Sequence, residues 1–266
     1  MRVQSLLPSH CRACGRLARQ RRLGSVAATQ AGPFHVERFG LVHCRRCDVV
    51  YLDPPPTAED LHTLYQESVQ FSDAHYTEPA RVADMLRYYA ASVRDRGLLP
   101  DSPGSRVLEV GAGLAWVSRV CKSIDPSVVT VAQDVSAECA DNCEWVDRYH
   151  VGPLATLDAA APFQLASMSH VIEHLVDPAA MLGAIAARLA PGGKLFVTAP
   201  YRPSGWTARD GIAAWREYTY LHVPAHVTYL SLKWFKRHAR QHGLRVEHWY
   251  AGQEDGQAFE LVLCRR

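Results

Sequence analysis

A glycine turn that follows a buried strand constrains the fold of this chain more than any other feature. Residues 107–110 are typical of a buried strand, and Gly111 and Gly113 then open a turn that leads into a helix. Glycine lets the backbone approach a ligand that a Cβ would obstruct, and the helix N-terminus supplies amide donors. Asp134 ends the next strand about 20 residues later, where a carboxylate can accept hydrogen bonds from both hydroxyls of a ribose. The pattern predicts a nucleotide-type cofactor.

The residues around the turn favour S-adenosylmethionine over a dinucleotide. The third glycine of a dinucleotide fingerprint would fall at Trp116, whose indole argues against close packing of a pyrophosphate. The spacing fits E-x-G-x-G instead, with Ala115 as the last small residue. Glu109 suits a cationic methionine moiety and is unfavourable beside a diphosphate.

Two C-x2-C pairs near the N-terminus predict a metal module. Residues 15–43 separate them, a gap longer than the usual span of about 15–20 residues. Two such knuckles offer four thiolates in the tetrahedron that Zn²⁺ prefers, with no open position for catalysis. A redox pair would sit beside a βαβ unit, and a disulfide is unexpected in a cytoplasmic chain. We therefore expect a structural zinc at Cys11, Cys14, Cys44 and Cys47, and small buried residues at Cys121, Cys139, Cys143 and Cys264.

Composition limits the class of protein. The chain has 266 residues, with 48% apolar and 21% charged, which fits a soluble globular protein with one large domain and a small module. It contains no apolar run of membrane-spanning length and no signal-peptide core, so a cytoplasmic protein without membrane partners is expected. Residues 1–50 hold nine arginines against Glu37 and Asp48, a formal charge of +7. This segment is either a solvated basic face or a patch for phosphate or RNA.

Four stretches resemble the successive motifs of class I S-adenosylmethionine-dependent methyltransferases. They are "VLEVGAGLA", "VAQDVS", "SHVIEHLVDPAAMLGAIAARLAPGGKLFVTAP" and "HVTYLSLKWFKRHARQHGLRV", and the resemblance covers about residues 104–264. The third stretch is especially similar to the ubiquinone-pathway O-methyltransferases, and paired C-x2-C motifs also occur in some bacterial members. The resemblance implies an α/β fold with a Rossmann-like, seven-stranded, mostly parallel sheet, an antiparallel last strand and helices on both faces.

The same resemblance implies roles for individual residues. The methionine part of the cofactor would lie against Glu109, Gly111 and Gly113, and Asp134 would hold the ribose. Ser169 and His170 would lie beside the sulfonium. Two departures are expected to be tolerated, namely Ala115 for a glycine and Gln164 for the acid that opens the fourth strand.

The stretch "SHVIEHLVDP" resembles a metal motif of the same family. Ubiquinone-pathway O-methyltransferases and small-RNA 2′-O-methyltransferases have E-x-x-E-H there, which binds a divalent metal, and the RNA enzymes add a further histidine. The matching positions are His170, Glu173, His174 and His226, and His170 replaces a Glu. Imidazoles with one carboxylate suit Zn²⁺, Mn²⁺ or Fe²⁺ better than Mg²⁺.

A reading without a catalytic metal stays open. Glu173 and His174 could only hydrogen-bond backbone groups at the turn. His170 or His226 could then act as general base, because an imidazole has a pKa near neutrality. His222 is an alternative base.

The predicted organisation has three parts. Residues 1–52 form a zinc-ribbon-like module, 53–103 a linker and helical lead-in, and 104–266 the methyltransferase domain. Thr57 is expected to cap a helix over 58–67, and further helices are expected near 78–98, 178–190 and 231–243. An insert at about 201–230 leaves the carboxyl end of a strand and is expected to cover the substrate, or else to use its aromatics only to attach to the body. Its candidate contact residues are Tyr201, Arg202, Trp206, Arg209, Trp215, Arg216, Tyr218 and Tyr220.

These observations together predict an enzyme that transfers a methyl group from S-adenosylmethionine to an oxygen of a small-molecule acceptor. An RNA methyltransferase that docks RNA on the basic zinc module is the first alternative. A cofactor-binding protein without turnover is the second, and the intact Glu109, Gly111, Gly113 and Asp134 argue against it.

Overall fold

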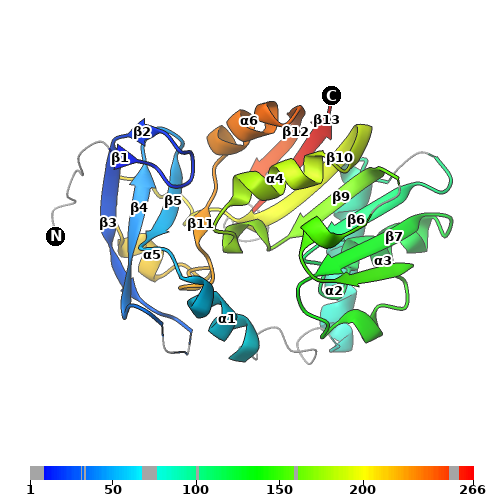
Figure 1. The fold of residues 1–266 in the computed structure, drawn as a ribbon, viewed down its shortest axis with the longest axis horizontal. Coiled ribbons are helices and arrows are strands. Elements are labelled where there is room, and N and C mark those ends of the chain that lie inside the picture. The colour runs from blue at the N-terminus through cyan, green and yellow to red at the C-terminus, as the bar shows by residue number, and fades with distance from the viewer. Residues whose placement is uncertain are drawn as a thin grey trace.

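Figure 1 shows a large sheet with helices on both sides and, at one end, a smaller β unit that contains the N-terminal segment. This computed structural model describes residues 9–30, 32, 34–67, 77–99, 102–158, 161–251 and 258–266. Within those ranges, no helix combines the length and the hydropathy needed to cross a membrane.

The large sheet has seven strands in the order β12-β13-β10-β9-β6-β7-β8. The five strands from β10 to β8 are parallel, and β13 runs antiparallel to both of its neighbours. The predicted seven-stranded, mostly parallel sheet is therefore confirmed. The strands are β6 (Arg106–Val110), β7 (Val129–Asp134), β8 (Arg148–Val151), β9 (Phe163–Ser169), β10 (Leu189–Pro200), β12 (Leu244–Ala251) and β13 (Ala258–Arg265).

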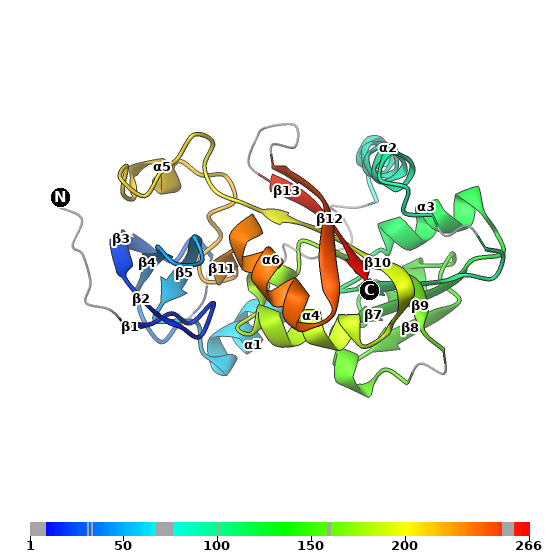
Figure 2. The same cartoon turned by 90° about the horizontal axis from the view of Figure 1, so that it is seen from above.

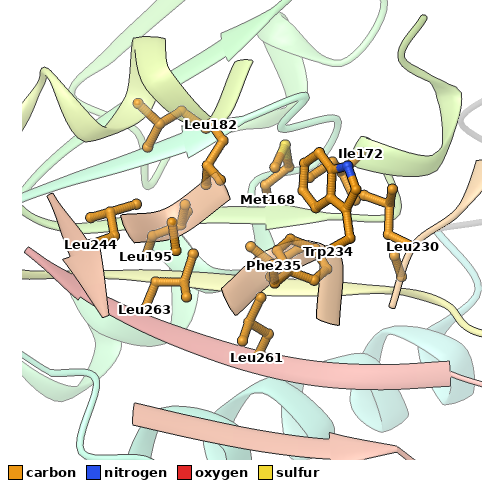
Figure 3. Close-up of a cluster of buried hydrophobic side chains, with 14 of the residues drawn as sticks. Met168, Ile172, Leu182, Leu195, Leu230, Trp234, Phe235, Leu244, Leu261 and Leu263 are labelled. Atoms are coloured by element: carbon orange, nitrogen blue, oxygen red, sulfur yellow. The ribbon is translucent and has the colours of Figure 1, made fainter. Parts of the chain in front are cut away.

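Helices cover both faces of this sheet because its strands are apolar on both sides. In β10, Leu195 and Val197 face one hydrophobic cluster and Phe196 faces the other. Figure 3 shows the first cluster, in which Leu182, Trp234 and Phe235 pack on the strands. Its helices are α4 (Pro178–Ala186) and α6 (Leu232–Gln241), and the opposite face carries α2 (Pro79–Asp95) and α3 (Trp116–Ile124).

Side-chain caps fix where several helices begin. Thr57 Oγ1 accepts from Asp60 N, and Asp60 Oδ2 accepts from Thr57 N, so α1 (Ala58–Glu67) starts with a reciprocal capping box. Asp177 caps α4 by accepting from Ala180 N, and Ser231 caps α6 by accepting from Trp234 N. The expected helix over 178–190 is too long, because α4 ends at Ala186 and residues 189–193 already belong to β10. The register against β9 shifts between Leu189 and Lys194, so the "PGG" segment forms an irregular strand entry.

The smaller unit combines N-terminal strands with one strand from the insert. A two-stranded sheet of β1 (Ser9–His10) and β2 (Leu17–Ala18) stands beside a four-stranded sheet in the order β11-β5-β4-β3. The latter contains β3 (Gln20–Ala27), β4 (Arg38–Cys44), β5 (Val49–Asp53) and β11 (Thr228–Tyr229). Thr228 pairs with Tyr51 and Tyr229 with Val50, so residues from both predicted domains share this sheet.

The insert packs mainly against this N-terminal sheet. Trp206, Trp215 and Tyr218 are buried in one hydrophobic cluster with Phe39 and Leu41. Figures 1 and 2 both place the short helix α5 (Ala213–Arg216) beside β3 and away from the large sheet. These three aromatics therefore attach the insert to the N-terminal sheet, and the substrate-covering role of the insert stays a prediction.

Candidate active site and metal centres

The glycine turn between β6 and α3 adopts the left-handed conformation that its sequence requires. Gly111 has φ +59° and Gly113 has φ +46°. A Cβ on Gly111 would lie 2.4 Å from Cγ2 of Val171, whereas a Cβ on Gly113 would meet nothing within 4 Å. Gly111 thus lets the turn pack against the segment after β9, and Gly113 borders open space. Ala115, which replaces the usual glycine, is buried with φ +50°.

Glu109 secures the turn from within the protein. Its carboxylate accepts hydrogen bonds from Val117 N at 3.2 Å, from Ser118 N at 2.8 Å and from Ser118 Oγ at 2.8 Å. Burial raises the pKa of Glu109 to about 7, against the effect of these donors. The carboxylate therefore binds the N-terminus of α3, and its expected contact with the methionine moiety stays a prediction.

Asp134 lies next to the turn, as the sequence predicts. Its Oδ2 accepts from Gly113 N at 2.9 Å and its Oδ1 accepts from Ser136 N at 3.0 Å. Sequence reasoning missed Tyr149, whose hydroxyl donates to the Gly113 carbonyl at 2.9 Å. No motif marks Tyr149, because its role depends on β8 lying beside β7.

Ser169 and His170 lie at the carboxyl end of β9, on the same edge of the sheet. His170 has φ +53° and its amide donates to Thr198 O at 2.9 Å. Its imidazole is 44% exposed and stacks on Tyr220 of the insert, with ring centroids 6.1 Å apart. Because Val171 contacts Gly111, this segment borders the cofactor turn directly.

Three of the four predicted metal-binding side chains form one compact group. Glu173, His174 and His226 each offer a ligand atom, and these atoms lie within 4.8 Å of one another. His170 is outside this group, although its Nδ1 lies 3.5 Å from Glu173 Oε1. Among the described residues, neither carboxylate oxygen of Glu173 has a hydrogen bond of normal geometry, although the side chain is buried. A buried, unsatisfied carboxylate beside two imidazoles fits a bound cation.

The electrostatics keep these ligands in the states that a metal requires. Burial raises the pKa of Glu173, but the nearby His170, His174 and His226 outweigh it and lower that pKa to about 2. Burial lowers the pKa of His226 to about 3 and also lowers that of His174. His226 Nδ1 lies 2.7 Å from the Tyr220 carbonyl, which fixes the proton on Nδ1 and leaves Nε2 as a lone-pair donor. These pKa directions favour an ionised carboxylate and unprotonated imidazoles in this group.

The four N-terminal cysteines also come together. Cys11 and Cys14 follow β1, Cys44 and Cys47 bracket the turn from β4 to β5, and all four sulfurs lie within 4.8 Å of one another. Contact with the Cys44 sulfur, together with burial, raises the pKa of Cys11 to about 12. Four buried sulfurs at this spacing can all be thiolates only with a cation among them. The set of donors and its burial fit Zn²⁺.

The insert and α6 connect the two candidate metal centres. Ser231 Oγ donates to Cys47 O, and Trp234 Nε1 donates to Ala13 O, both at 2.5 Å. Val227 N donates to Glu173 O at 2.8 Å, and Val227 O accepts from Leu52 N at 3.0 Å. The strand that follows His226 is therefore held by the cysteine module on one side and by the Glu173 turn on the other.

The remaining predicted residues have local roles. Gln164 Oε1 accepts from Arg106 N at 2.8 Å, which explains why an amide can replace the usual acid there. Arg202 pairs with Asp48 at 3.1 Å, and Tyr201 packs edge-on against Trp249. Arg209 and Arg216 are exposed, and the cysteines at 121, 139, 143 and 264 are buried.

Comparison with known proteins identifies a methyltransferase domain. Residues 81–249 match the methyltransferase domain family. A ubiquinone biosynthesis O-methyltransferase of Paramagnetospirillum magneticum is 33% identical over 132 residues, which is 47% of this chain and 52% of that protein. One from Xanthomonas campestris is 34% identical over 135 residues, covering 47% and 50%. The chain spans about half the length of these curated relatives.

Solved structures of methyltransferases share the fold. An amino pentose methyltransferase of Micromonospora echinaspora superposes with a TM-score of 0.52 at 17% identity, over 72% of this chain and 98% of that one. An S-adenosylmethionine-dependent methyltransferase of Mesorhizobium loti gives 0.52 at 16% identity, over 68% and 100%. The family match covers most of the chain, so the chain belongs to the S-adenosylmethionine-dependent methyltransferase family.

Proposed function

We propose that this enzyme methylates a hydroxyl group of a small-molecule acceptor, with a divalent cation held by Glu173, His174 and His226. The observation that carries the proposal is the compact group of one buried, unpartnered carboxylate and two imidazoles, which follows the Val171 segment that packs on Gly111. The similarity to ubiquinone biosynthesis O-methyltransferases supports oxygen as the methylated atom.

The residues divide the work of the reaction. Gly113 leaves room for the cofactor, Asp134 accepts hydrogen bonds from the ribose hydroxyls, and Ser169 and His170 border the reacting centre. S-adenosylmethionine, when bound, supplies a methyl group on a sulfonium for in-line displacement, and alignment of the acceptor provides much of the rate.

The metal ligands and a nearby ring handle the acceptor. A cation on Glu173, His174 and His226 would lower the pKa of an acceptor hydroxyl. The half-exposed ring of Tyr220, stacked on His170, offers a flat face for an acceptor. His170 is exposed enough to take the acceptor proton as general base.

A second part of the proposal concerns the cysteine module. We infer that Cys11, Cys14, Cys44 and Cys47 hold a structural zinc that fixes the two knuckles. Because Ser231 and Trp234 donate to the knuckle backbone, this metal also stabilises the segment that carries His226.

Elemental analysis of purified protein, combined with calorimetry, tests the proposal. We expect about two metals per chain, and Glu173→Gln should reduce the content to about one and leave zinc in place. A Gln side chain is nearly isosteric, so binding of S-adenosylmethionine should persist while methylation of a panel of phenols and alcohols is lost.

Glu217→Gln provides the control, because Glu217 is an exposed residue of the insert, and it should change neither metal content nor turnover. Full turnover in Glu173→Gln would contradict the metal mechanism. A short RNA methylated in preference to every small acceptor would contradict the choice of substrate class.

A further inference from the structure

A strongly basic groove lies on α6, at the opposite edge of the sheet from the cofactor turn. Its volume is about 730 Å³, and Gln241 and Val246 contribute to its lining. The six cationic side chains in the lining are Lys233, Lys236, Arg237, Arg240, Arg245 and Arg266. Figures 1 and 2 both show α6 beside β12 and the C-terminal end of β13. Leu244 pairs with Arg265 there, whereas the cofactor residues lie at the carboxyl ends of the parallel strands.

Like charges are neighbours on the exposed face of α6. Lys233, Lys236, Arg237 and Arg240 follow one another at helical spacings of three and four, so like charges are neighbours along one face of α6. Lys233 stands in the first turn, where a cation opposes the helix dipole, and no acid accompanies it there. The other face of α6 is buried against the sheet through Trp234 and Phe235.

Carboxylates compensate little of this charge. Of the six cations, only Arg245 has an ion pair among the described residues, with Glu247 at 2.5 Å, and Glu247 is shared with Lys194 at 3.9 Å. No acidic residue is part of the lining. The groove therefore concentrates positive potential in a concave site, which raises the local concentration of anions.

We propose that this groove binds a small ligand that carries two or more adjacent phosphate groups, of the size of a nucleoside diphosphate. Its volume lies within the range of about 300–1,000 Å³ that is typical of small-molecule sites. Four of the six cations are arginines, whose planar guanidinium groups bind phosphate oxygens in pairs. A single carboxylate or phosphate would leave most of the charge unbalanced.

Calorimetric titration of the full chain with inorganic tripolyphosphate, and separately with ADP, tests the inference. We expect both to bind at low salt, with an affinity that falls at least about tenfold between about 50 and 200 mM salt. The double variant Lys236→Ala/Arg240→Ala should weaken both ligands at least about tenfold, because it removes two of the exposed phosphate donors. The matched control Arg209→Ala/Arg216→Ala removes two exposed arginines from the insert and should leave the affinity unchanged.

Several outcomes would overturn the inference. They are an absence of heat with either phosphate at low salt, an equal loss in the control variant, and binding of an RNA oligonucleotide that tripolyphosphate does not displace. Binding of S-adenosylmethionine should be unchanged in both double variants, because the groove and the cofactor turn lie at opposite edges. A failure at the groove therefore leaves the proposed function untouched.

Discussion

Ser231→Ala should destabilise the protein more than the loss of a helix cap alone. Ser231 Oγ accepts from Trp234 N at 3.1 Å and donates to Cys47 O at 2.5 Å, so one hydroxyl both caps α6 and binds the backbone of a cysteine knuckle. Loss of the cap costs about 1 kcal/mol. Leaving the buried Cys47 carbonyl without its donor costs about 1–3 kcal/mol more. The expected decrease in the free energy of unfolding is therefore about 2–4 kcal/mol.

Asp177→Ala provides the matched control. Asp177 caps α4 through Ala180 N at 2.9 Å, and among the described residues its side chain has no hydrogen bond to the cysteine knuckles. Its removal should cost only about 1 kcal/mol. The difference between the two variants isolates the bond to Cys47.

Thermal unfolding and zinc release measure this difference. Each kcal/mol corresponds to about 2–4 °C in Tm for a protein near this size, so Ser231→Ala should lower Tm by several degrees more than Asp177→Ala. Ser231→Ala should also release zinc faster to a chromogenic chelator, while Asp177→Ala should not. Equal losses of Tm and equal release rates in the two variants would refute the reasoning.

Three further predictions concern the turn, the fold and the metal. Gly111→Ala should lower the free energy of unfolding by several kcal/mol, because the new Cβ would clash with Val171. Gly113→Ala should lower it by only about 1 kcal/mol, measured in melting curves, but should weaken S-adenosylmethionine binding at least about tenfold in calorimetry. The reverse ranking of the two Tm values would contradict the geometry. Burial raises the pKa of Glu260, but donors from Tyr88, Ser92 and Arg96 outweigh it and lower that pKa. The contribution of ionised Glu260 to the free energy of unfolding is present above the unfolded-state pKa and is lost as pH falls through the folded-state pKa. Glu260→Gln should therefore reduce the free energy of unfolding, measured by urea unfolding, by about 2 kcal/mol at pH 7 and by much less in acid. An equal loss at both pH values would argue against the ionic contribution. Removal of zinc with a strong chelator should expose tryptophan, through loss of the Trp234 contact with Ala13, and an unchanged fluorescence spectrum would show that the knuckles do not depend on metal.

Local patterns made the cofactor turn and the cysteine cluster predictable. Gly111, Gly113 and Asp134 each stand at the end of a strand, and the carboxyl ends of parallel strands meet at one edge of a sheet. Cys11 and Cys14, like the second pair, are separated by the two residues that a knuckle needs. In each case the local geometry of the turn or the knuckle is set by residues that are close in sequence, so this geometry was predictable, and the binding roles stay predictions.

Contacts between distant segments were not predictable in the same way. The two residues of β11 have no periodic pattern, and their partner β5 lies more than half of the chain length earlier. By composition alone, the aromatics of the insert could equally have faced a substrate. Trp206 and Trp215 instead pack against the N-terminal sheet, whose position the sequence does not reveal. The engagement of Glu109 by α3 likewise depends on the path of the helix after the turn.

The late arrival of β11 has a consequence for biosynthesis. Tyr51 and Val50 are made early, but their partners Thr228 and Tyr229 leave the ribosome only after most of the methyltransferase domain has been translated. Until then the β5 edge and the aliphatic surface around Leu41 stay open to water and to other nascent chains. The four-stranded sheet therefore stays incomplete until translation has passed Tyr229.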